Sequence, residues 1–124
     1  MRHLLARTAG PLLLLLVVIA APAAADDPVI EAVTAQDTGS GWTFDVTLSH
    51  PDTGWDHYAD GWRVLSMEGE ELGLRVLYHP HVNEQPFTRS LSGVEIPEGQ
   101  TQVRVQARCI VHGWSDETYV VELN

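Results

Sequence analysis

The sequence predicts an all-β fold, and two observations support this prediction. Apolar and polar side chains alternate over several short runs, and clusters of Gly, Pro and Asp separate those runs. After residue 25, no long segment has the 3.6-residue apolar period of an amphipathic helix. We therefore expect short strands joined by turns, and each is justified below in chain order.

Residues 1–25 have the features of a secretory signal peptide. Arg2 and Arg7 precede an unbroken apolar run over 11–21, and small residues around Ala25 fit a cleavage site. This run is shorter than the roughly 20 residues of a transmembrane helix. We expect a signal peptide helix over 1–25 that is cleaved on export. The protein would then be periplasmic or secreted, with no membrane span left after cleavage.

The first two expected strands are separated by a glycine-rich turn. Residues 29–35 are rich in apolar side chains, and a turn with Asp37, Gly39 and Gly41 follows them. Residues 42–49 alternate strictly between apolar and polar side chains, which is typical of a half-buried strand.

The next two strands form an expected hairpin. Trp62 and Val64 indicate the third strand, and the turn at 67–70 leads into the fourth strand at 72–78. Pro80 cannot donate a hydrogen bond to a central ladder, so we expect the fourth strand to have ended before it.

Three strands complete the expected domain, at 87–91, 103–111 and 119–123, with a strong turn at 96–99. Seven short strands within residues 26–124 predict a single β-sandwich domain, immunoglobulin-like or fibronectin type III-like, with about seven antiparallel strands. Trp62 would be its core tryptophan. Cys109 would lie where immunoglobulin domains place one half of their disulfide.

The composition limits the classes of partner. Without residues 1–25 the chain has five arginines, no lysine and seventeen acidic residues, a formal charge of −12. Nucleic-acid binding is therefore not expected, because contacts to phosphate require a basic face. Cys109 is the single cysteine, so an intramolecular disulfide is excluded. Its place in an apolar alternation predicts a buried thiol, with an intermolecular disulfide as the alternative.

Two segments carry a resemblance to a known group of proteins. They are 54–60, Gly-Trp-Asp-His-Tyr-Ala-Asp, and 79–91, which begins His-Pro-His-Val-Asn-Glu. Through these segments the chain resembles small exported proteins of Gram-negative bacteria that have no assigned activity. The resemblance covers most of residues 26–124 and implies no functional residue.

Histidines are the most informative candidate site residues. His79 and His81 are two residues apart on extended backbone, which places both imidazoles on one face. His50 continues the inward-facing positions of the second strand, and His57 and His112 lie in loops. In a sandwich the loops after the second, fourth and sixth strands lie at one end. We therefore expect a transition-metal site, copper or zinc, at this end.

Two other interpretations of these histidines remain open. Each histidine taken singly is expected to be a solvated loop residue. Together they could instead form a pH-sensitive patch.

A binding surface for another exported protein is the alternative function. Its expected residues are exposed aromatic and charged side chains near the same loops, with a salt bridge from Arg89 to a nearby carboxylate. They are Trp55, Asp56, Tyr58, Glu84 and Arg89. No catalytic motif was found, so we do not expect an enzyme. The sequence thus predicts an exported binding protein, with a metal site favoured over a protein-interaction module.

Overall fold

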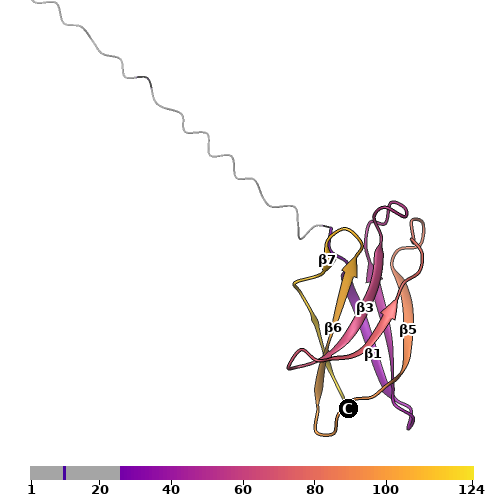
Figure 1. The fold of residues 1–124 in the computed structure, drawn as a ribbon, viewed down its shortest axis with the longest axis vertical. Helices are drawn as coiled ribbons and strands as arrows, with labels where there is room; N and C mark the ends of the chain where they lie inside the picture. Colours follow the sequence, from indigo (N-terminus) through magenta and orange to yellow (C-terminus); the bar gives the residue numbers. More distant parts are fainter. Residues whose placement is uncertain (1–9, 11–25) are drawn as a thin grey trace, which may run out of the picture.

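The structure is a computed structural model that describes residue 10 and residues 26–124. The expected signal peptide therefore lies outside the described residues, except for Gly10. Residues 26–124 contain eight strands and no helix, in two antiparallel sheets (Figure 1). The strands are β1 (Val29–Asp37), β2 (Trp42–Ser49), β3 (Ala59–Ser66), β4 (Glu71–Val76), β5 (Phe87–Val94), β6 (Gln102–Cys109), β7 (Gly113–Trp114) and β8 (Tyr119–Glu122). The described residues include no helix long and apolar enough to cross a membrane.

The two sheets divide the strands unequally. One sheet has the order β1-β2-β5. The other has the order β4-β3-β6, with β7 and β8 both pairing with β6 at different positions along it. Arg108 pairs with Trp114 near one end of β6, and Gln102 pairs with Glu122 near the other. Thus β6 extends along the whole sandwich, and β7 and β8 each cover part of its edge.

The core lies between the sheets and follows from the two-residue alternation. Strand β2 directs Phe44, Val46 and Leu48 inward, and all three are fully buried. On the facing sheet, the buried positions of β3 and β6 include Trp62, Val64, Val103, Val105 and Ala107. Each apolar row removes its side chains from water, which is the main free-energy gain of this fold.

The expected all-β fold is confirmed, but two strands end earlier than expected. Strand β4 ends at Val76, and Tyr78 is 74% exposed beyond it. Strand β6 ends at Cys109 because the chain then turns back. Ile110 and Val111 lie in this turn and are exposed. The short strand β7 follows the turn and was not predicted, because two residues are too few to show an alternation.

The pairing places one set of loops at a common end of the sandwich. Val29 pairs with Ser49 and Leu48 with Phe87 in the first sheet, while Ala59 pairs with Cys109 in the second. Three loops therefore lie at the same end of the two sheets (Figure 1). They are the loops 50–58, 77–86 and 110–112. We call this end of the sandwich the histidine end, because the five histidines at 50, 57, 79, 81 and 112 belong to these loops.

Candidate metal centre

The centre forms where an inward-facing row from each sheet ends. In β2 the row Phe44, Val46, Leu48 continues to His50, one residue past the strand. In β6 the row of alternate buried residues ends at Cys109. His50 is 3% exposed and Cys109 is 1% exposed, which confirms the expected inward direction of His50 and the expected buried thiol.

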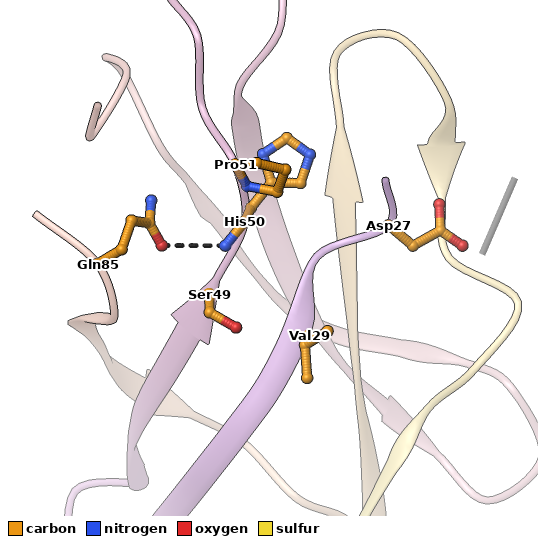
Figure 2. Close-up of a pocket in the computed structure, with 6 residues that line it drawn as sticks. All are labelled: Asp27, Val29, Ser49, His50, Pro51 and Gln85. Atoms are coloured by element: carbon orange, nitrogen blue, oxygen red, sulfur yellow. Dashed lines mark hydrogen bonds between the residues drawn. The ribbon is translucent and has the colours of Figure 1, made fainter. Parts of the chain in front are cut away.

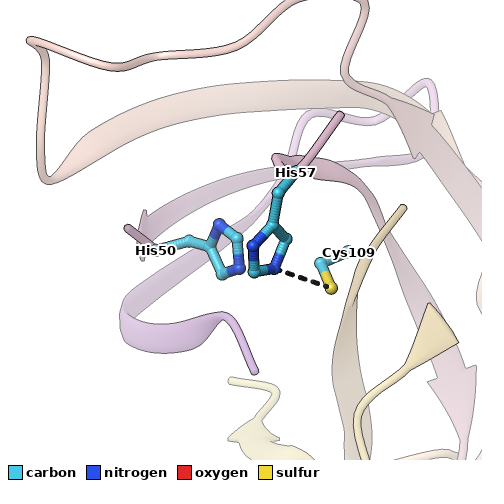
Figure 3. A group of neighbouring side chains, drawn as sticks. All are labelled: His50, His57 and Cys109. Atoms are coloured by element: carbon cyan, nitrogen blue, oxygen red, sulfur yellow. Dashed lines mark hydrogen bonds between the residues drawn. The ribbon is translucent and has the colours of Figure 1, made fainter. Parts of the chain in front are cut away.

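His57 lies next to both of these side chains (Figure 3). Its Nε2 is 3.8 Å from the Cys109 Sγ, and its ring centroid is 4.9 Å from that of His50. One donor atom from each of the three residues lies within 4.8 Å of the other two. Donors that bind one metal ion at 2.0–2.3 Å lie about 3–4 Å apart, so small side-chain movements would let all three reach a common ion.

Backbone contacts fix the positions of His57 and Cys109. A tight turn holds His57, whose N–H donates to the Gly54 carbonyl at 3.2 Å while its own carbonyl accepts from the Thr53 N–H at 3.0 Å. The Cys109 Sγ accepts a hydrogen bond from the His112 N–H at 3.2 Å. This contact fixes the direction of the sulfur atom, which is the atom of cysteine that binds metal.

The carboxylate of Asp52 contacts the ring of His50 and holds its orientation. Its buried carboxylate lies 2.5 Å from His50 Nδ1. It also accepts hydrogen bonds from the Ala59 N–H at 2.9 Å and the His81 N–H at 2.8 Å. Metal-binding histidines usually donate their second ring N–H to a carboxylate in this way, which fixes the orientation of the ring. We did not predict this role for Asp52, although its position two residues after an inward-facing His50 was a usable indication.

Asp26 and His112 lie beside this centre. The Asp26 carbonyl oxygen is 2.7 Å from His50 Nε2. The His112 ring centroid is 5.6 Å from that of His57, and His112 Nε2 is 3.8 Å from the Asp26 carboxylate. Neither residue belongs to the set whose donor atoms all lie within 4.8 Å of one another.

His79 and His81 form a separate pair at the same end of the sandwich. Their ring centroids are 4.5 Å apart, and the His81 ring stacks on Phe87 at 3.9 Å with an interplanar angle of 10°. Arg89 contacts His81 Nε2 at 2.8 Å. Since a guanidinium can only donate, this nitrogen accepts the hydrogen bond and its lone pair is occupied. The structure thus brings two of the five predicted histidines, His50 and His57, together with Cys109, which we did not predict as a ligand, and leaves this pair outside.

The surroundings of His81 favour its neutral form. Burial lowers the pKa of His81 below its ordinary value, and the positive charge of Arg89 and the neighbouring His79 lower it further. Glu84 and Asp52 act in the opposite direction but more weakly. A neutral ring is what the hydrogen bond from Arg89 requires.

An open hollow of about 290 Å³ is lined in part by His50 (Figure 2). Its lining residues are Asp27, Val29, Ser49, His50, Pro51 and Gln85. The Gln85 side chain accepts a hydrogen bond from the His50 N–H at 2.9 Å and donates one to the His81 carbonyl at 3.0 Å. Gln85 therefore connects the 50–58 loop to the 77–86 loop.

The residues expected to form a protein-binding surface fall into two groups. Trp55, Asp56 and Tyr58 lie in the 50–58 loop, where Trp55 is 68% exposed and packs edge-to-face on Tyr58 at 5.8 Å. Glu84 and Arg89 lie near the 77–86 loop and approach each other to 3.7 Å. The expected salt bridge of Arg89 is thus formed with Glu84.

Comparisons with known proteins give one clear relative. A protein of Halomicrobium mukohataei described as "Putative lipoprotein" is 40% identical over 94 residues, which is 76% of this chain and 46% of the relative. The chain thus spans about half the length of the curated relative that it matches. No family model matches the chain. Among solved structures, the superoxide reductase (1Fe-SOR) from Giardia intestinalis is similar over 76% of this chain and 98% of its own. The TM-score is 0.48 and the identity 22%.

Proposed function

We propose that this protein is an exported single-domain β-sandwich that binds a transition-metal ion through His50, His57 and Cys109. The observation that carries the proposal is the convergence of two imidazoles and one thiol, each with a donor atom within 4.8 Å of the other two. The buried carboxylate of Asp52 contacts His50 Nδ1, and a carboxylate in this position normally orients the ring of a metal-binding histidine.

The donor set favours copper or zinc. Thiolate sulfur is a soft ligand and imidazole nitrogen is a borderline one, and copper and zinc accept both. Hard cations such as magnesium and calcium prefer oxygen ligands and would leave the thiol unused. We therefore propose a site for copper or zinc, with a position left for a fourth ligand.

The strand order and the relative support the rest of the proposal. The two antiparallel sheets, one of order β1-β2-β5 and the other built around the pair β3-β6, support an immunoglobulin-like or fibronectin type III-like sandwich as part of this proposal. The relative described as a lipoprotein agrees with export, as does the N-terminal sequence of residues 1–25. We propose that residues 1–25 are cleaved and that residues 26–124 function outside the cytoplasm.

Calorimetric titration of the exported protein with Zn(II) and with Cu(II) tests the proposed site. The wild type should bind one ion per chain, and Cys109→Ser and His57→Ala should each weaken binding by at least tenfold. His79→Ala is the matched control, since it removes an imidazole at the same end of the sandwich but outside the cluster. The absence of saturable binding in the wild type, or equal losses in the His79 control, would refute this site.

A protein-interaction module is the second candidate function. The specific observation in its favour is Trp55, a large aromatic side chain that is 68% exposed in the 50–58 loop. Aromatic residues are enriched at protein interfaces. This function predicts a partner whose affinity falls in Trp55→Ala while zinc affinity stays unchanged. Measuring the partner affinity and the zinc affinity of Trp55→Ala and of Cys109→Ser separates the two functions.

A further inference from the structure

Exposed apolar side chains gather at the histidine end of the sandwich. Nine large apolar side chains are exposed in residues 26–124, and six of them lie at this end, in the three loops or at the start of β1 beside them. They are Val29, Trp55, Tyr78, Val82, Ile110 and Val111. The turns at the opposite end, 38–41, 67–70 and 95–101, contain none of the nine. The exposed apolar surface is therefore concentrated at one end of the domain (Figure 1).

Hydrogen bonds join the three loops into one connected surface. The Ile110 N–H donates to the Tyr58 carbonyl at 3.0 Å, which connects the 110–112 loop to the 50–58 loop. The Asp52 carboxylate accepts from the His81 N–H at 2.8 Å, which connects the 50–58 loop to the 77–86 loop. Trp55 packs edge-to-face on Tyr58 and still remains 68% exposed. The exposed side chains therefore lie on loops that are fixed to one another.

The same end carries negative charge. The three loops contain no arginine and the chain has no lysine, whereas Asp56 and Glu84 are exposed within these loops. Arg89 approaches Glu84 at 3.7 Å, but Asp56 forms no ion pair within residues 26–124. A surface that is both apolar and acidic fits a partner that presents apolar side chains beside lysine or arginine.

The charge favours a protein over other occupants of an apolar surface. A lipid bilayer would have to accommodate the carboxylate of Asp56, which directly follows Trp55 in the chain, and a charged side chain in lipid is costly. A second copy of the chain would bring two acidic surfaces together, and like charges across an interface oppose association. A basic protein meets neither obstacle.

We propose that the histidine end is a docking surface for a basic protein outside the cytoplasm, with Trp55 and Tyr78 as its main apolar contacts. This inference rests on the second candidate function and on the proposed export, and it adds the extent of the surface and the charge of the partner. Trp55 and Tyr78 are the most exposed of the six apolar side chains, at 68% and 74%. Aromatic side chains often contribute most of the binding free energy of an interface, and surrounding acidic groups speed the approach of a basic partner.

Two synthetic peptides serve as probes of this surface, titrated calorimetrically into the metal-free exported protein. One alternates leucine with lysine, and the other alternates serine with lysine and so keeps only the charge. We expect saturable binding of the leucine–lysine peptide and much weaker binding of the serine–lysine peptide. Trp55→Ala and Tyr78→Ala should each weaken binding by about tenfold, as the loss of a central aromatic contact does. Tyr119→Ala is the matched control, since Tyr119 is 37% exposed on β8, outside the histidine end, and should change binding by less than about twofold.

Charge is tested by one substitution at each end of the sandwich. Asp56→Asn should weaken binding of the leucine–lysine peptide by about threefold, the size of one exposed ion pair. Glu98→Gln, in the exposed turn at the opposite end, removes the same charge and should leave the affinity unchanged. Equal losses in the two variants would overturn the inference, because the net charge of the chain would then explain both.

The remaining outcomes also decide the inference. It is overturned if the wild type binds neither peptide, binds both equally, or loses as much affinity in Tyr119→Ala as in Trp55→Ala. Binding to phosphatidylcholine vesicles that Trp55→Ala abolishes would overturn it in favour of a bilayer. A dimer in analytical ultracentrifugation that Trp55→Ala abolishes would overturn it in favour of a second copy. Zinc titration of the same protein is independent, since a wild type that binds the peptide and no zinc refutes the metal site alone.

Discussion

Asp52 is the residue on which the histidine end depends most. Its buried carboxylate receives hydrogen bonds from three separate parts of the chain, the ring of His50 and the backbone of Ala59 and His81. Removing a charged acceptor leaves these buried donors without partners, and each lost bond to a charged group contributes about 1.5–3 kcal/mol.

We expect Asp52→Ala to lower the free energy of unfolding by about 3–5 kcal/mol, near the upper end of single-substitution effects. Asp56→Ala, at an exposed position of the same loop, should change it by less than about 0.5 kcal/mol. Urea unfolding followed by tryptophan fluorescence measures both. Similar values for the two variants would show that the contacts of Asp52 are not structurally important.

His81 gives the protein a pH-dependent stability of predictable sign. Its pKa is lowered in the folded protein by burial and by Arg89, whereas in the unfolded chain it returns to about 6.5. Between these two values the unfolded chain binds more protons, so stability is full above pH 6.5 and falls as the pH decreases through the folded pKa. His81→Gln should lose less stability than wild type between pH 7.5 and pH 5. An identical loss in both proteins, measured by urea unfolding, would contradict this.

Part of the candidate site could be predicted residue by residue. The two-residue alternation correctly placed His50 and Cys109 on the inner faces of their strands. The same rule put His79 and His81 on one face of a strand; their rings are neighbours, but both residues lie in the loop after β4 and not on a strand. It could not predict that Arg89 donates a hydrogen bond to His81 Nε2. Nor could it predict that Cys109, and not His81, lies beside His57 in the cluster. Such contacts depend on loop conformation, which alternation does not specify.

At the scale of elements, strands with a long alternation were predicted best. The range 42–49 agrees with β2, and a turn was expected where Gly39 and Gly41 separate β1 from β2. Strand β7 was missed because its two residues pair only at the end of β6. The guanidinium groups of Arg63 and Arg108 lie 3.9 Å and 4.9 Å from the centre of its Trp114 ring, and these contacts come from two other strands.

The β1–β2 turn allows a matched test of backbone conformation. Gly39 and Gly41 both have a positive φ, of 83° and 103°, which side-chain-bearing residues adopt only at a cost. A Cβ at Gly39 would meet no atom within 4 Å, whereas a Cβ at Gly41 would lie 3.1 Å from the backbone of Gly93. Gly39→Ala should therefore cost about 1 kcal/mol and Gly41→Ala about 2–3 kcal/mol. Equal costs in urea unfolding would show that the contact with Gly93 relaxes freely.

At the scale of the whole molecule, the sandwich brings distant residues to one end. His50 follows β2 of one sheet and Cys109 ends β6 of the other, 59 positions apart in the chain. Antiparallel pairing places both at the same end of the core, and the 50–58 loop then crosses between the sheets with His57. The all-β fold of short strands could be predicted from the strand pattern, and the histidine loops lie at one end of the two sheets as expected. The exact donor set required the three-dimensional structure.

X-ray absorption spectroscopy of the zinc-loaded protein tests the central claim most directly. Two imidazoles and one thiolate predict one sulfur at about 2.3 Å and nitrogen or oxygen neighbours at about 2.0–2.1 Å. The sulfur shell should disappear in Cys109→Ser. A wild-type spectrum with nitrogen and oxygen neighbours alone would contradict the account, because it would place the metal away from Cys109.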